Sequence, residues 1–184
     1  LPLLPYYAVR FGADAFALGG LLAAYSFAQL ICSPLWGGLS DRIGRRPILI
    51  GSLFASAVSQ LAFGLAGSLA MLFAARLVAG TASATIGVAQ AYIADSTTPE
   101  NRAKGMGIIG AAFGLGFVFG PALGGLLAPW GHGVPAFAAA GLALVNGLFA
   151  LALLPESLPA ERRGEKMVRG FSPKRLALAA GITG

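Results

Sequence analysis

Long uncharged stretches alternate with short charged segments along this chain. Charged residues are absent from 15–40, 47–75, 77–94 and 105–155. A helix needs about 20 apolar residues to cross the hydrocarbon core of a bilayer, whereas the strands of a membrane barrel have about 10 residues and alternate in polarity. The uncharged stretches are longer than such strands and do not alternate. The pattern therefore predicts an all-α, polytopic membrane protein.

Turn-forming residues divide the longest stretches, near 67–68 and at 129–135. Residues 1–155 are predicted to form a transmembrane bundle that contains the end of a first span and five further spans, at about 18–39, 47–67, 69–94, 105–128 and 134–154. We expect a cytoplasmic loop between two halves at 156–174 and the start of a seventh span at 175–184. Because the chain opens and closes within apolar stretches, we expect it to be truncated at both ends.

Composition supports this prediction, and charge orients the spans. The chain is 57% hydrophobic and 11% charged, whereas about a quarter of the residues in soluble domains are charged. Eleven of the thirteen Lys and Arg residues lie within 42–46, 102–104 and 162–175, on alternate connections. Cytoplasmic loops are enriched in Lys and Arg. The net charge of +6 therefore indicates the topology of a multi-pass protein of the cell's inner (plasma) membrane, and we expect no nucleic-acid partner.

The connection between the second and third predicted spans carries the pattern Gly-x-Leu-x-Asp-Arg-x-Gly-Arg-Arg over residues 37–46. Gly44 permits a tight turn, and Asp41 stands at a membrane boundary, where a carboxylate can cap a helix or pair with a nearby Arg. We interpret this loop as a cytoplasmic gate with ion pairs that break and re-form. A plain positive-inside anchor with a turn is the alternative. The candidate gate residues are Gly37, Asp41, Arg42, Gly44, Arg45 and Arg46.

Small and polar residues share one face of the predicted fourth span. Arg76, Gly80, Ser83, Gly87 and Gln90 recur at spacings of four and three, which places them on one side of a helix. An arginine within the membrane usually faces a cavity or a partner, although it can also reach the interface. We interpret this face as lining a cavity, with close helix packing as the alternative. Other intramembrane polar residues could line the same pathway or form hydrogen bonds between helices, namely Tyr25, Gln29 and Gln60.

The predicted fifth span carries glycines at spacings of four, with a proline among them. Gly116, Gly120 and Gly124 would let another helix approach closely, and Pro121 can bend the span. The segment 120–126, which includes Gly125, also resembles the segment 33–39, because a proline, two glycines and a leucine coincide. The two segments lie three spans apart in oppositely directed helices, as a 3+3 inverted repeat predicts. Coincidence in a chain rich in Gly, Ala and Leu is the alternative.

These motifs resemble those of the major facilitator superfamily, and within it the drug:proton antiporters of the tetracycline-exporter type. The likeness covers nearly the whole chain and is carried by residues 40–49, 91–95, the fifth-span glycines and 154–157. It implies a twelve-span protein, of which this chain is most of the N-terminal six-helix half. It further implies that the glycines of the fifth span form an antiporter-type motif and that Arg76 takes part in proton coupling.

The resemblance also suggests roles for two carboxylate positions. Asp95, at the end of the fourth span, would join Asp41 and Arg45 in a charge relay, or it would simply cap the following loop. Ser59 stands where tetracycline exporters commonly carry an aspartate, and Ala79 replaces the usual Gln of the fourth-span motif. The missing aspartate puts tetracycline itself in doubt as the cargo.

We therefore expect a secondary active transporter that exports a small amphipathic drug or metabolite in exchange for protons, by alternating access. Its partners would be the substrate, protons, the lipid bilayer and the missing C-terminal half of the protein. An uptake carrier for a sugar or organic acid, and a non-transporting membrane sensor, are the alternatives. The sequence has one His and one Cys and lacks a Gly-x-x-x-x-Gly-Lys phosphate loop. We expect no enzyme activity, catalytic residue, cofactor or metal site.

Overall fold

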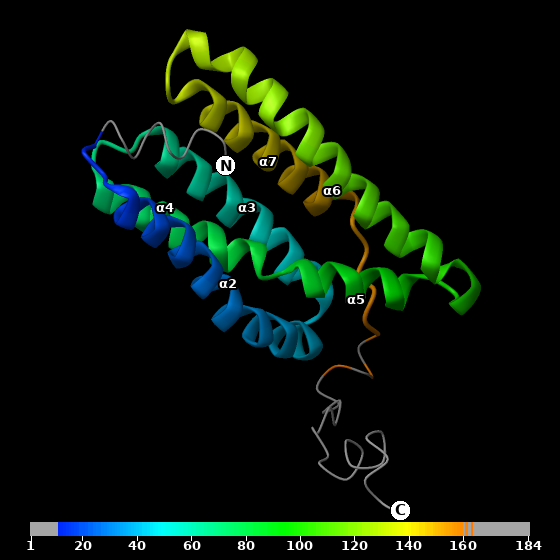
Figure 1. Ribbon diagram of the computed structural model, residues 1–184. Coiled ribbons are helices and arrows are strands. Elements are labelled where there is room, and N and C mark those ends of the chain that lie inside the picture. The colour runs from blue at the N-terminus through cyan, green and yellow to red at the C-terminus, as the bar shows by residue number, and fades with distance from the viewer. Residues whose placement is uncertain (1–10, 160, 162, 164–184) are drawn as a thin grey trace, which may run out of the picture.

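Helices form nearly all of the computed structural model, which describes residues 11–159, 161 and 163 (Figure 1). In this part of the chain the elements are α2 (Ala15–Ile43), α3 (Arg45–Gly64), α4 (Leu69–Ser83), α5 (Ile86–Ser96), α6 (Pro99–Leu127), the short 3-10 helix η1 (Ala128–Trp130) and α7 (Val134–Leu153). They provide five segments that are long and apolar enough to cross a membrane, with α4 and α5 forming one of them. The predicted all-α, multi-span fold is confirmed. The predicted parts of a first and a seventh span, at 1–8 and 175–184, lie outside the described residues.

Helix α2 runs through most of the segment that we interpreted as a loop. It starts after Asp14, whose side chain accepts a hydrogen bond from the amide of Ala17 (2.7 Å), and it continues to Ile43. Only Gly44 separates it from α3. Gly44 has a φ of +108°, a conformation that residues with a side chain rarely adopt. Charged residues at the end of the span are compatible with a helix, so the turn depends on this glycine alone.

The predicted polar loop at 95–104 is also mostly helical. Helix α5 ends at Ser96 and α6 begins at Pro99, which leaves only Thr97 and Thr98 between them. Proline suits the first turn of a helix, where its missing N–H removes no hydrogen bond, and a negative charge such as that of Glu100 is favourable there. The Thr-Pro-Glu sequence therefore starts a helix, and the loop interpretation was wrong for most of this segment.

The fourth span is interrupted, although its sequence pattern predicts one continuous span at 69–94. Helix α4 ends at Ser83 and α5 begins at Ile86. The amide of Ala84 donates to the carbonyls of both Gly80 (3.1 Å) and Thr81 (3.3 Å), as in the tightened last turn of a helix. The segment contains no proline, so it lacks the usual sequence signal for a break.

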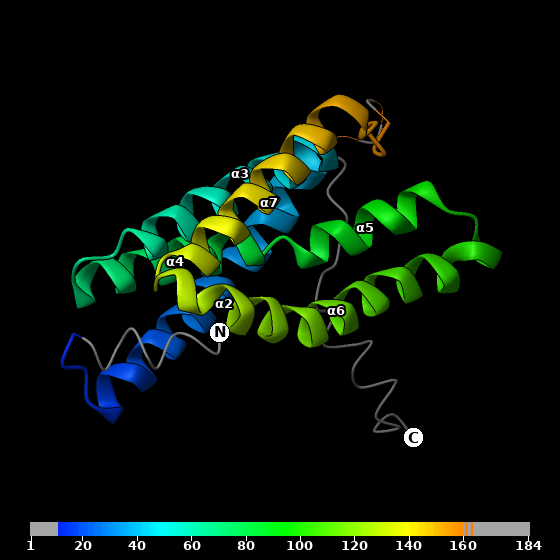
Figure 2. The ribbon, with the colours of Figure 1, turned by 90° about the horizontal axis from the view of Figure 1, so that it is seen from above.

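The helices pack around one buried cluster. Helix α2 packs along α4, while α3 packs against both α4 and α7. The cluster consists of Leu21, Phe63, Leu72, Ala75 and Ala136, from these four helices. Helix α6 contacts the others mainly through α5 and α7, and Figure 1 shows it apart from α2 and α4. Figure 2, a view from above, shows the bend between α4 and α5 that carries α5 away from the cluster.

The lengths and turns of the helices agree with an inverted repeat. Helices α2 and α6 are both 29 residues long and contain Pro34 and Pro121 respectively. Helices α3 and α7 are both 20 residues long and pack against each other. The shift along the sequence that places Pro34 on Pro121 also places Gly44 on Gly131, and both glycines have a positive φ. Each glycine follows the longer helix of its pair.

Candidate functional site

Arg45 is the centre of a charge network at one end of the bundle, where α2 ends, α3 begins and α5 ends. Its side chain is buried, with the whole residue 4% exposed. It forms ion pairs with Asp41 on α2 and with Asp95 on α5, where Nε lies 3.2 Å from Oδ2 of Asp95. Its Nη1 donates to the hydroxyl of Ser40 (2.6 Å), which donates in turn to the carbonyl of Gly37 (2.8 Å). One arginine in the first turn of α3 thus joins the ends of α2 and α5.

Glu156, which follows α7, completes this network. Its carboxylate accepts hydrogen bonds from the amides of Arg45 (2.9 Å) and Arg46 (3.3 Å), the first two residues of α3. It also pairs with Arg163 (3.8 Å). Amides at a helix N-terminus have no partner within the helix and favour a negative charge, so Glu156 caps α3 from a distant part of the sequence. The sequence pattern did not predict this role for Glu156, although Glu156 is the only acidic residue in 101–160.

The other residues of the 37–46 motif have separate roles. Arg46 donates from Nη2 to the carbonyl of Leu151 on α7 (2.6 Å). Gly44 lies against the carboxylate of Glu156, so that a Cβ at this position would be 2.8 Å from Cδ of Glu156. Arg42 is exposed and lies outside the hydrogen bonds and ion pairs seen in the described part of the chain. The structure brings together the predicted gate residues Gly37, Asp41, Gly44, Arg45, Arg46 and Asp95.

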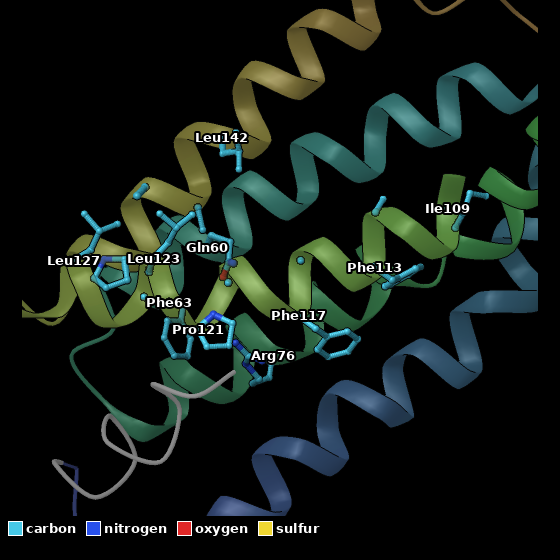
Figure 3. Close-up of a pocket in the computed structure, with 18 of the residues that line it drawn as sticks. Gln60, Phe63, Arg76, Ile109, Phe113, Phe117, Pro121, Leu123, Leu127 and Leu142 are labelled. Atoms are coloured by element: carbon cyan, nitrogen blue, oxygen red, sulfur yellow. The ribbon is translucent and has the colours of Figure 1, made fainter. Parts of the chain in front are cut away.

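A cavity of about 850 Å³ lies among α3, α4, α6 and α7 (Figure 3). Gln60 and Arg76 are the polar side chains among the described residues that line it, and the rest of the lining is apolar. The lining includes the rings of Phe63, Phe113 and Phe117. The cavity therefore suits an amphipathic molecule, because apolar walls surround a small number of polar groups.

Arg76 extends from α4 to the wall of this cavity, close to Phe63 in Figure 3. The residue is 8% exposed. Its guanidinium carbon lies 4.9 Å from the centroid of the Phe63 ring, within the range of a cation–π interaction. Its Nε is buried and has no hydrogen-bond partner among the described residues. A buried charge is costly unless it is paired, so the site favours an anionic or hydrogen-bonding group next to Arg76.

The predicted polar face of the fourth span is divided between two environments. Arg76 lines the cavity, whereas Gly80 packs against α2, where a Cβ would lie 2.8 Å from Cβ of Ala28. The alternative of close helix packing therefore applies at Gly80. The other residues that we predicted to line the cavity are not part of its lining, namely Tyr25, Gln29, Ser83 and Gln90.

The motif of the predicted fifth span forms one wall of the cavity. The lining includes Gly116, Gly120, Pro121 and Gly124 of α6. No described atom lies within 4 Å of a Cβ built on Gly116, Gly120 or Gly125, beyond the near neighbours of each glycine in its own helix. The predicted close approach of another helix is therefore not observed at these three glycines within the described part of the chain. The glycines instead leave gaps between the larger side chains of α6, such as Phe113 and Phe117, that also line the cavity.

Ser59 differs in role from the aspartate that the resemblance places there. It is buried and donates its hydroxyl hydrogen to the carbonyl of Ala75 on α4 (2.9 Å). This hydrogen bond joins α3 to α4, and Ser59 does not line the cavity. Within 11–159, 161 and 163, no group of three or more His, Cys, Asp and Glu residues is placed to bind a metal.

The fold and the site define a multi-pass membrane protein with a charge network at one end of its helix bundle and a largely apolar cavity among its helices. The sequence profile of the Major Facilitator Superfamily matches residues 1–182, and the chain belongs to this family. It is 44% identical over 155 residues to tetracycline resistance protein, class C, of Escherichia coli, an alignment that covers 84% of this chain and 39% of that protein. Multidrug resistance protein 2 of Bacillus subtilis (strain 168) is 36% identical over 164 residues, which cover 89% of this chain and 41% of that protein.

A solved structure supports the same assignment. The crystal structure of the human organic anion transporter MFSD10 (TETRAN) superposes with a TM-score of 0.72 at 35% sequence identity, covering 87% of this chain and 38% of that chain. The chain thus spans about two fifths of the length of these relatives. It is a multi-pass protein of the inner (plasma) membrane, in agreement with its five membrane-length segments.

Proposed function

We propose that the full-length protein is a secondary active transporter that exports a small amphipathic drug or metabolite in exchange for protons. The observation that carries the proposal is Arg76, a buried cation on the wall of an apolar cavity inside the membrane. Ionisable residues in such places are costly and usually serve substrate or proton pathways. The relatives described as tetracycline and multidrug resistance proteins support export as the direction of transport.

The charge network would act as the cytoplasmic gate of this transporter. Arg45 joins α2, α3 and α5, and Glu156 joins the start of α3 to the segment after α7. Opening the bundle at this end must separate these groups and expose Arg45. During alternating access, the protein would change between a state in which the network is formed and a state in which it is broken. The ionic contacts set the relative free energies of the two states.

Arg76 would couple the cavity to protons through charge. A carboxylate close to a guanidinium is stabilised in its ionised form, and its protonation removes the ion pair. An acidic group that reaches Arg76 during the cycle would therefore bind it when ionised and release it when protonated. The partner half of the protein, absent from this chain, would close the other side of the cavity. Neither a cofactor nor enzyme activity is needed for this cycle.

The test is proton-driven transport by the full-length protein in inverted membrane vesicles, with a fluorescent amphipathic dye as the probe. Arg76→Ala should lower the rate at least about tenfold, the effect of losing one strong interaction of a buried charge. Arg76→Lys retains the charge and should keep part of the rate, and Arg42→Ala, an exposed arginine of the same chain, should keep nearly all of it. Full proton-driven transport by the Arg76→Ala protein would contradict the role of Arg76. Dye that accumulates in intact cells, or that does not move at all, would favour an uptake carrier or a non-transporting sensor.

A second candidate cargo is an organic anion. It is favoured by the fact that Arg76 is the single charged residue of the described cavity lining, and by the human relative described as an organic anion transporter. A matched pair of dyes with the same ring system, one anionic and one cationic, separates the two cargo classes. A preference for the anion that disappears in Arg76→Ala would support the anion. Ser59, in place of the aspartate of tetracycline exporters, favours a cargo other than tetracycline.

A further inference from the structure

At the break in the fourth span, a side chain of a neighbouring helix donates a hydrogen bond to a backbone carbonyl. In a continuous α-helix the carbonyl of Thr81 would accept from the amide of Thr85. Here it accepts from the amide of Ala84 (3.3 Å) and from the indole N–H of Trp36 on α2 (2.9 Å). The hydroxyl of Thr85 donates to the carbonyl of Ala82 (2.8 Å). Unsatisfied backbone groups are costly in a membrane, and such side-chain donors are what makes a break tolerable there.

Helix α2 contacts the fourth span directly before the break. Gly80 lies so close to α2 that a Cβ there would be 2.8 Å from Cβ of Ala28. Trp36 lies further along α2, about one turn before Asp41. A single helix therefore contacts the end of α4, the carbonyl at the break and the charge network.

Helix α5, beyond the break, packs against α2, α3 and α6. Val88 is its only buried residue. Near its end, the Tyr92 hydroxyl donates to the carbonyl of Pro155 (3.1 Å), the carbonyl of Ala94 accepts from Nη2 of Arg102 (3.1 Å), and Asp95 pairs with Arg45. The angle at the break sets the direction in which α5 leaves α4, and so contributes, together with these contacts, to where Asp95 lies relative to Arg45.

We propose that Trp36 is a positioning residue of the cytoplasmic gate. By donating to the carbonyl of Thr81, its indole fixes the bend of the fourth span and so directs α5, which brings Asp95 to Arg45. Trp36 itself neither lines the cavity nor belongs to the ion-pair network. The inference rests on the proposed function of that network as a gate.

The experiment uses the full-length protein in liposomes, in a background in which Cys32 and every cysteine outside this chain are replaced by Ser. Spin labels are attached at Val58 on α3 and at Ser96 at the end of α5, which are both exposed. The distance between the labels reports the position of α5. It is measured with and without Trp36→Phe, which keeps an aromatic ring but removes the N–H. We expect a shifted or broader distance distribution and a transport rate about five- to tenfold lower, as expected for the loss of one hydrogen bond at the break. Trp130→Phe is the matched control, since Trp130 is 71% exposed, and it should change neither measurement.

A second comparison separates positioning from general destabilisation. If Trp36 acts through Asp95, then Trp36→Phe should lower transport less than about twofold further in an Asp95→Asn protein. The proposal would be overturned if the two substitutions lowered transport by factors that multiply in the double variant. It would also be overturned if Trp36→Phe lowered the unfolding temperature but left the distance distribution unchanged. The distance measurement needs no transport, so an unchanged distribution refutes the role of Trp36, whereas a shifted distribution in a protein that transports nothing refutes only the proposed function.

Discussion

The turns that follow α2 and α6 have similar backbones and opposite chemistry. Gly44 has φ and ψ of 108° and 159°, and Gly131 has 134° and 150°. Gly44 lies within a network of buried and half-buried charges, whereas the segment 129–135 around Gly131 has no formally charged residue. The turn therefore needs only a glycine. The charges are an addition at one end of the repeat, and we propose that they serve orientation and gating instead of the turn itself.

The largest expected effect comes from removing the centre of that network. Arg45→Ala leaves Asp41 and Asp95 close together without their common partner. Because removing one partner of a buried ion pair leaves uncompensated charge, and both carboxylates are about one third exposed, we expect a loss of about 2 kcal/mol in stability. Proton-driven transport should fall at least about tenfold. Vesicle transport and SDS-induced unfolding measure the two effects.

Arg42→Ala is the matched control, because Arg42 is an exposed arginine in the same motif. It should change stability by less than about 0.5 kcal/mol. Equal effects of Arg42→Ala and Arg45→Ala would indicate a positive-inside anchor without a gate.

The next effect compares the two glycines directly. Gly44→Ala and Gly131→Ala both place a side chain at a positive φ, which costs about 1–3 kcal/mol. At Gly44 the new Cβ also meets the carboxylate of Glu156, whereas at Gly131 the nearest atom is Cγ2 of Val134 at 3.4 Å. We expect the Gly44 variant to be less stable in SDS-induced unfolding and to transport more slowly. A larger effect at Gly131 would contradict the conclusion that the contact with Glu156 makes the turn at Gly44 the more sensitive of the two.

The membrane-spanning helices could be predicted from the sequence, because a segment that crosses a bilayer must be long and nearly free of charge. Uncharged stretches of sufficient length became helices, and Gly44 became the turn. The pairing of Asp41 with Arg45 was one of the alternatives that the spacing allowed. The helix ends were less predictable, because Asp41, Arg42 and the residues after Pro99 continue or start helices despite their polarity.

The tertiary contacts of the site could not be predicted from spacing. Glu156 and Arg45 meet only because α3 and α7 pack together. The break at Ala84 and its contact with Trp36 have no proline or other local signal. Gly80 and Arg76 share a helix face, yet the positions of α2 and α6 give them different neighbours.

The smallest expected effect separates the cap on α3 from the ion pairs of Arg45. Glu156→Ala removes the acceptor of the amides of Arg45 and Arg46 and should cost about 1 kcal/mol, as loss of a helix cap does. The side-chain pairs of Arg45 with Asp41 and Asp95 remain, so transport should fall less than in Arg45→Ala. Glu156→Gln keeps an acceptor and should recover part of the stability in SDS-induced unfolding. The segment around the opposite turn, 129–135, contains no acidic residue that could act in the same way. If Glu156→Ala lowered transport as much as Arg45→Ala does, the cap and the ion pairs would act as one unit.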